Sequence, residues 1–72
     1  MFKIEYVIVQ RRHQLGVVER MVSGAHKRAD AEFTARSLLD KVRREHPKSP
    51  PDGYQILDIF GRVVLRSWER QR

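Results

Sequence analysis

The sequence predicts a small α+β domain in the order strand, strand, helix, strand, strand, written ββαββ. Three observations predict it. Polar and apolar residues alternate over residues 2–9 and an apolar stretch follows at 15–23, apolar residues change to a helical spacing near Arg28, and a proline-containing loop leads into a closing hairpin. Such an order corresponds to a four-stranded, mainly antiparallel sheet with the helix packed on one face.

The first two strands are expected at about residues 2–10 and 15–23. In the first, aromatic and β-branched residues occupy every second position: Phe2, Ile4, Tyr6 and Ile8. This alternation is typical of a strand with one buried face. The second stretch contains three valines and a methionine, but its pattern leaves its inward face open. Polar residues 10–14 connect the two strands.

The helix is expected at about residues 28–46. Its apolar residues fall on one stripe of core-facing width: Ala31, Ala35, Leu38, Leu39 and Val42. Asp30 lies near its start and Arg43 and Arg44 near its end, as the helix dipole favours. Pro47 ends the helix because it cannot continue the backbone hydrogen bonding.

Residues 54–58 and 62–68 predict a closing hairpin, with Gly61 supplying a positive φ in the turn. We expect Leu57 opposite Val63 and Ile56 opposite Val64, and opposed residues share a face. One face then holds Leu57, Val63 and Leu65, and the other holds Tyr54, Ile56, Val64, Arg66 and Trp68. Residues 69–72 are expected to fray. Residues 54–64 resemble the closing hairpin of small bacterial ββαββ proteins of unknown function, which implies a layout and no activity.

Composition predicts one domain over residues 1–72. A chain of this length buries only about 60% of the surface that it exposes when unfolded. It contains no cysteine to form disulfides, so good packing or oligomerisation must stabilise it. No apolar run approaches the roughly 18 residues of a membrane span, and a cytoplasmic location is the expectation. The net charge of +6 favours an anionic partner.

The first functional hypothesis is a non-catalytic interaction module that forms a homodimer. Both faces of the predicted sheet are apolar near the middle, and one helix covers only one of them. A second copy of the chain, meeting the open face or an edge strand, is the simplest cover. The interface candidates are Val7, Val9, Ile59, Phe60 and Trp68. Alternatively, Trp68, arginine stems and loops shield this face within one chain.

The second hypothesis is a nucleic-acid-binding accessory protein. Basic loops and an aromatic residue among arginines could contact phosphates and stack on bases. The candidates are Arg11, Arg12, Lys27, Arg28, Arg66, Trp68 and Arg70. The sequence matches no standard nucleic-acid-binding module, and interspersed carboxylates could pair with many of these arginines.

An enzyme is the third hypothesis. His13, His26 and His46 have no metal-ligand spacing, and no serine lies in a nucleophile elbow. The dispersed glycines form no phosphate loop. The sequence therefore predicts no cofactor, no metal and no small-molecule ligand, and a small ribonuclease using histidine and arginine is the form that an enzyme would take.

Overall fold

A computed structural model of the chain describes residues 1–10 and 15–69. Its elements are β1 (Phe2–Val9), β2 (Leu15–Ser23), α1 (Arg28–Glu45), β3 (Gly53–Leu57) and β4 (Val63–Arg66). The predicted ββαββ order is therefore confirmed. The largest difference in bounds is at β4, which begins one residue later and ends two residues earlier than expected. Of the predicted frayed tail, only Glu69 lies within the described residues.

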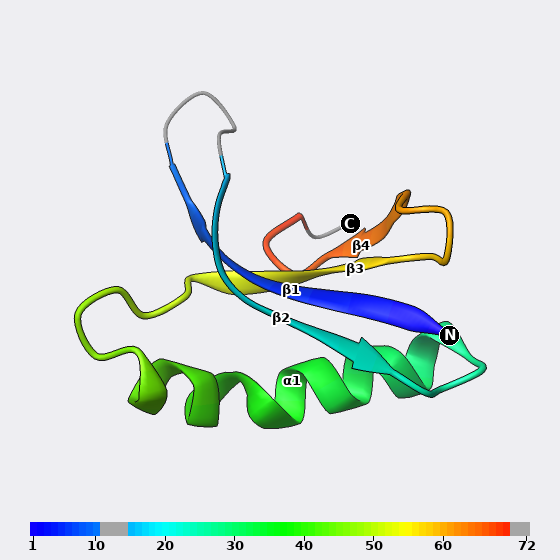
Figure 1. Cartoon of the computed structure of the whole chain (residues 1–72), viewed down its shortest axis with the longest axis horizontal. Helices are drawn as coiled ribbons and strands as arrows, with labels where there is room; N and C mark the ends of the chain where they lie inside the picture. The colour runs from blue at the N-terminus through cyan, green and yellow to red at the C-terminus, as the bar shows by residue number, and fades with distance from the viewer. Residues whose placement is uncertain (11–14, 70–72) are drawn as a thin grey trace.

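The four strands form one antiparallel sheet in the order β2-β1-β3-β4. The helix lies along one side of this sheet, and the other side, which we call the open face, carries no helix (Figure 1). The segment after β4 turns back over the open face, and β1 and β2 bend away from the helix toward their shared hairpin (Figure 1). Among the described residues, no helix combines the length and apolar character needed to span a bilayer.

The core lies between α1 and the two central strands. Ile4, Tyr6, Tyr54 and Ile56 from the sheet pack with Ala31, Ala35 and Val42 from the helix. The small alanine side chains leave room for the two tyrosine rings, which meet edge to face at 6.3 Å between centroids. The Tyr6 hydroxyl donates a 2.8 Å hydrogen bond to the Ala35 carbonyl. Burial raises the pKa of Tyr6 to about 12.

The loop after α1 fixes where β3 begins. The guanidinium of Arg43 donates hydrogen bonds to the carbonyls of Pro51 and Asp52, at 3.0 and 3.2 Å. Asp52 also joins the loop to β1, because its amide donates to the Val7 carbonyl and its carboxylate accepts from the Val9 amide, each at 2.8 Å. These bonds hold the end of the helix and the start of β3 against β1.

Each hairpin contains one bulge, and the second bulge corrects a predicted register. In β1–β2 the pairing shifts between Tyr6 and Val7, and Val18 is the extra residue. In β3–β4 the pairing shifts between Ile56 and Leu57, so Ile56 lies opposite Leu65 rather than Val64. The prediction assumed regular pairing. It was right for Leu57 opposite Val63 and wrong for Ile56.

The β3–β4 bulge also changes which residues share a face. Leu65 packs on the helix side, because it pairs with the core residue Ile56. Arg66 pairs with Gln55 and lies on the open face. The expected grouping of Arg66 with Tyr54 and Ile56 is thus corrected.

Candidate interaction surface

The open face of the sheet includes three rows of side chains that cross three or more strands, followed by the pair of Val9 and Leu15 on β1 and β2. Ile4, Tyr6 and Ile56 point into the core, so the alternating residues on β1 and β3 point the other way. Cross-strand pairing extends each row: Val22, Lys3, Leu57 and Val63 form the first, Arg20, Glu5, Gln55 and Arg66 the second, and Val17, Val7 and Gly53 the third.

The middle row is a continuous polar network across all four strands. Glu5 accepts hydrogen bonds from Arg20 at 2.9 Å and from the Gln55 amide at 2.7 Å. Arg66 donates to the Gln55 carbonyl oxygen and to Glu69, each at 3.4 Å. The middle of the open face is therefore polar and internally satisfied, contrary to the expectation that it is apolar.

The titration of Glu5 reflects this network. Burial alone would raise the pKa of Glu5, but the hydrogen bonds from Arg20 and Gln55 and the nearby charges of Arg20 and Lys3 outweigh it. The net result is a lowered pKa. Glu5 is therefore ionised at neutral pH, and its charge is already shared among these neighbours.

Two of the three residues in the third row, Val7 and Gly53, are buried by the chain itself, whereas Val17 on the edge strand is exposed. The segment after β4 is hydrogen-bonded along β3, with the Ser67 amide donating to the Tyr54 carbonyl and the Tyr54 amide donating to Ser67 Oγ, both at 2.9 Å. A Cβ atom at Gly53 would meet Ser67 Oγ and lie 3.4 Å from Cε3 of the Trp68 ring. The indole thus lies against Gly53, directly beside Val7 in the sheet, and Val7 has no exposed surface.

The first row remains uncovered by the described residues. Val22 is 65% exposed, Val63 is also exposed, and Leu57 between them is half-buried. The β3–β4 turn continues directly from Leu57 and carries Ile59 and Phe60, which are 63% and 75% exposed. We call these five residues, Val22, Leu57, Ile59, Phe60 and Val63, the apolar end. They include four of the seven large hydrophobic residues most exposed in the described chain.

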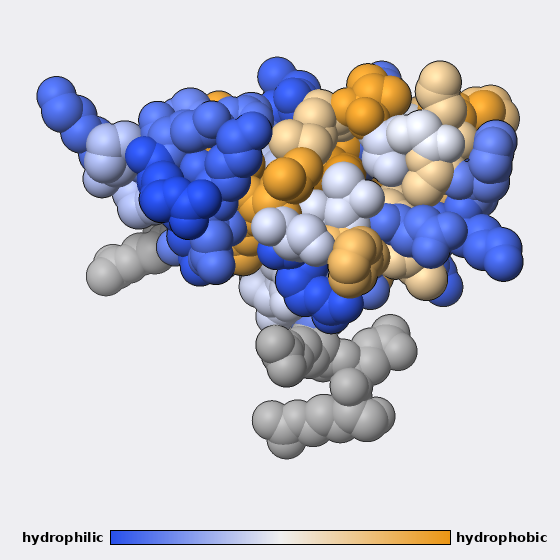
Figure 2. All heavy atoms as spheres, turned by 90° about the horizontal axis from the view of Figure 1, so that it is seen from below, coloured by the Kyte–Doolittle hydropathy of each residue, from blue (hydrophilic) through white to orange (hydrophobic). Residues whose placement is uncertain are grey.

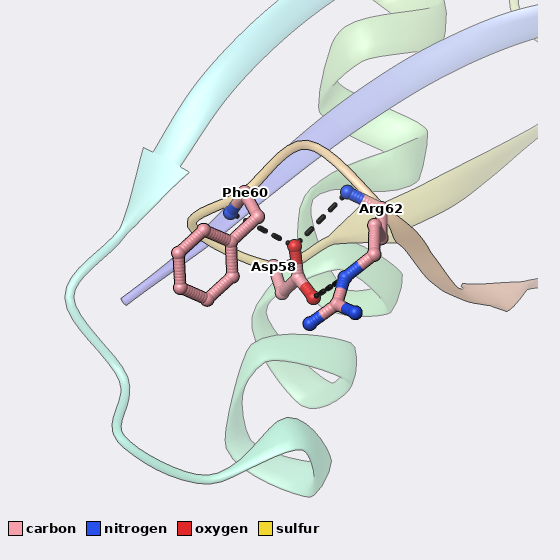
Figure 3. A network of polar contacts seen from close by, with 3 residues as sticks. All are labelled: Asp58, Phe60 and Arg62. Atoms are coloured by element: carbon pink, nitrogen blue, oxygen red, sulfur yellow. Dashed lines mark hydrogen bonds and ion pairs between the residues drawn. The ribbon is translucent and has the colours of Figure 1, made fainter.

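The β3–β4 turn is held in one conformation by Asp58. Its Oδ1 accepts hydrogen bonds from the Phe60 and Arg62 amides, both at 2.9 Å, and its Oδ2 pairs with Arg62 Nε at 3.1 Å. Figure 3 shows the carboxylate turned toward both residues. The Arg62 guanidinium lies 5.3 Å from the Phe60 ring centroid, and Gly61 adopts the φ of 81° that the turn requires. The backbone amide of Arg62, and then that of Phe60, hold the pKa of Asp58 below its usual value.

The charged residues are not spread evenly over the molecule. Seen from the helix side, the end where α1 finishes and the following loop lies is hydrophilic, whereas apolar residues are exposed across the middle and at the upper right (Figure 2). The hydrophilic end includes Lys41, Arg44 and Lys48, all exposed. The apolar end lies at the other end of the sheet, because Lys3 pairs with both Val22 and Leu57 close to the N-terminus.

The five predicted interface residues fall into two groups. Ile59 and Phe60 are among the most exposed apolar residues and belong to the apolar end. Val7 is buried within the single chain, and Val9 and Trp68 are half-buried. The alternative that Trp68 shields part of the open face within one chain agrees with the position of its ring against Gly53.

The predicted nucleic-acid residues are not brought together as one surface. Arg11, Arg12 and Arg70 lie outside the described residues. Lys27 and Arg28 are exposed at the start of α1, whereas Arg66 bonds to Gln55 and Glu69. Trp68, expected to stack on bases, lies against Gly53.

One open hollow lies between α1 and β4, with a volume of about 820 Å³. Both charge signs line it, with Arg28 and Arg66 facing Glu32 and Glu69. His46 Nε2 lies 3.0 Å from Glu19 Oε1, but neither residue lines this hollow. In the described part of the chain, no group of three or more histidine, aspartate or glutamate residues could hold a metal ion.

Sequence reasoning missed the middle polar row and the role of Asp58. The row depends on which side of the sheet meets the helix and on the β3–β4 bulge, neither of which the pattern defined. The signal for Asp58 was present, because an aspartate two residues before an exposed aromatic and four before an arginine, next to a turn glycine, is typical of a side-chain-capped turn.

Comparisons with known proteins return no match: no family model, no curated protein and no solved structure is similar to this chain.

Proposed function

We propose that this chain is a non-catalytic interaction module that binds another protein chain through the apolar end. The observation that carries the proposal is the exposure of Ile59 and Phe60 at the tip of a turn that Asp58 holds in place. Exposing large apolar side chains to water is unfavourable. Contact with a partner would bury them and so lower the free energy.

The rigidity of this turn supports binding rather than simple exposure. A flexible loop loses conformational entropy when it is ordered by a partner, whereas a turn already fixed by its own hydrogen bonds loses little. Aromatic anchors surrounded by smaller apolar contacts are typical of binding hot spots. Phe60 beside Ile59, with Val22, Leu57 and Val63 in the adjacent row, has this composition.

A second copy of the chain is the first partner to test, because it is the one predicted from the sequence. Homodimerisation would compensate for the small buried surface of a 72-residue chain without cysteine. The edges differ in how well they could support pairing. Both edge strands contain a bulge, but β4 has only four residues, a length that disfavours edge-to-edge pairing, whereas β2 offers nine residues.

Light scattering combined with gel filtration, and selection from a random peptide library displayed on phage, test the proposal together. The informative variant is the double substitution Ile59→Ser with Phe60→Ser. Its matched control is Phe33→Ser, because Phe33 is 64% exposed but lies on α1. We expect the wild type and the control to form a dimer or to enrich peptides. The double variant should weaken the affinity for the second copy or for those peptides at least tenfold.

Two results would overturn the proposal. One is a monomeric wild-type chain from which no peptide is enriched. The other is binding that the double variant retains in full while its circular dichroism spectrum shows an intact fold.

Nucleic-acid binding stays a prediction and is the second candidate function. The exposure of Lys27 and Arg28 at the start of α1 favours it. A salt titration of binding to duplex DNA, single-stranded DNA and RNA tests it, because counterion release makes log affinity fall linearly with log salt. The double variant Lys27→Glu with Arg28→Glu should abolish that binding, and unchanged affinity would exclude this surface.

A further inference from the structure

We infer that the partner segment bound by the apolar end is acidic as well as apolar, and that it belongs to another protein rather than to a second copy. The inference rests on the proposed function and specifies the chemistry of the partner. It depends on one cation, Lys3, and its position among the apolar residues.

Lys3 lies in the middle of the first row. Its cross-strand neighbours are Val22 on one side and Leu57 on the other, and its own side chain is exposed. A partner that covers Val22 and Leu57 must therefore also cover or contact the Lys3 ammonium. Removing that charge from water is unfavourable unless the partner supplies a carboxylate.

No carboxylate in the described part of the chain forms an ion pair with Lys3. The nearest in the sheet is Glu5, two residues along β1, whose oxygens already accept from Arg20 and Gln55. Asp58, at the edge of the apolar end, accepts from Phe60 and twice from Arg62. Lys3 therefore has no ion-pair partner within the apolar end, and Glu5, whose pKa it helps to lower, is already hydrogen-bonded to Arg20 and Gln55.

A second copy meets this requirement poorly. Docked through the same surface, it would bring its own Lys3 and an Asp58 that already accepts three hydrogen bonds within its own turn. Two chains of net charge +6 also repel each other. A segment with apolar side chains for Val22, Leu57 and Phe60 and a carboxylate for Lys3 satisfies both the apolar and the charged part of the surface.

The test compares peptides selected by the wild type with peptides selected by Lys3→Glu, using a random library of about 12-residue peptides on phage. We expect the wild type to enrich peptides with aspartate or glutamate next to apolar residues, and Lys3→Glu to enrich lysine or arginine at those positions. Fluorescence anisotropy should show that Lys3→Glu weakens a wild-type-selected peptide by about tenfold, and Lys3→Gln by less. Lys41→Glu is the matched control, because it makes the same charge change on exposed α1 and should leave the affinity unchanged.

The outcomes separate this inference from the proposed function. Peptides without an acidic bias that still require Ile59 and Phe60 would overturn the inference and leave the interaction module standing. A wild-type dimer lost in the Ile59→Ser/Phe60→Ser variant would do the same, because it identifies the partner as a second copy. A monomer that enriches no peptide would overturn both. Binding that responds to Lys3→Glu and Lys41→Glu equally would reduce the effect to net charge and also overturn the inference.

Discussion

The two ends of the open sheet face both carry valine side chains on β1 or β2, but these differ in how far they are buried. At one end Val7 has no exposed surface, and Trp68 lies against Gly53, its neighbour in the sheet. At the other end Val22 is 65% exposed, although it occupies the same face of the same sheet. The polar row from Arg20 to Arg66 separates the two ends.

The difference shows that burial on this face is decided by the segment after β4 rather than by the strands themselves. Alternating apolar residues specify a strand equally at both ends. The cover at one end comes from Ser67 and Trp68, and none of the described residues covers the other end. A cluster of exposed apolar residues at one end of the sheet therefore indicates a binding surface better than the hydrophobic content of the whole chain does.

The largest expected effect is on the free energy of unfolding, when a valine is replaced by alanine at each end of the open face. Val7→Ala removes fully buried methyl groups and should lower the free energy of unfolding by about 2 kcal/mol. Val22→Ala removes the same atoms from an exposed position and should change it by less than about 0.5 kcal/mol. Urea denaturation of both variants measures the difference, and equal losses would show that the two ends are not distinct.

The next effect tests the cover itself. Gly53→Ala places a Cβ atom against Ser67 Oγ and close to the Trp68 ring, so it should cost about 1–2 kcal/mol. Gly24→Ala is the control, because a Cβ atom there meets nothing within 4 Å. Quenching of Trp68 fluorescence by acrylamide should increase in Gly53→Ala and not in Gly24→Ala. A stable Gly53→Ala variant with unchanged quenching would contradict the proposed cover.

A smaller effect is expected from the polar row between the ends. Glu5→Gln removes the charge that pairs with Arg20, and since Arg20 is largely exposed the loss at pH 7 should be about 0.5 kcal/mol. The pKa of Glu5 is lowered in the folded state, so its contribution is present above the ordinary value of 4.5 and is lost as pH falls through the folded value. Wild type and Glu5→Gln should therefore converge in stability once the pH falls below the folded pKa of Glu5, which lies below 4.5. A difference that persists in acid would assign the effect to packing instead.

The smallest effect is local and concerns the exposed end. Asp58→Ala should leave the fold intact but release the Phe60 and Arg62 amides from their hydrogen bonds. The pKa of Asp58 is lowered, so the ordered turn should persist above its ordinary value of 3.8 and be lost only at lower pH. The NMR shift of the Arg62 amide should titrate below pH 3.8 in the wild type and show no such step in Asp58→Ala. A midpoint at or above 3.8 would contradict the capped turn.

The sequence predicted the fold because each element carries a local signal. The alternation from Phe2 to Ile8, the stripe from Ala31 to Val42 and the stop at Pro47 are each sufficient to define a strand or a helix. The register of β3–β4 could not be predicted in this way. A bulge adds one residue without changing composition, so nothing around Val64 distinguishes it from regular pairing.

The candidate site was only partly predictable for the same kind of reason. Ile59 and Phe60 were identified because apolar residues are unusual at a turn tip. Val22, Lys3 and Val63 were missed because their proximity depends on strands that meet only in the folded sheet. The burial of Val7 depends on a contact between Gly53 and Trp68, distant in the chain, which no local pattern encodes.

The two bulges have a consequence for how this chain can change in length. Deleting a residue from a regular strand turns every following side chain to the opposite face. Val18 and Val64 are extra residues, so the loss of either would join correctly paired neighbours, Val17 to Glu19 or Val63 to Leu65, with each side chain still on its present face. The strands can therefore lose one residue at either position and keep their pairing, although the loss of Val64 would also remove a side chain that packs against the core.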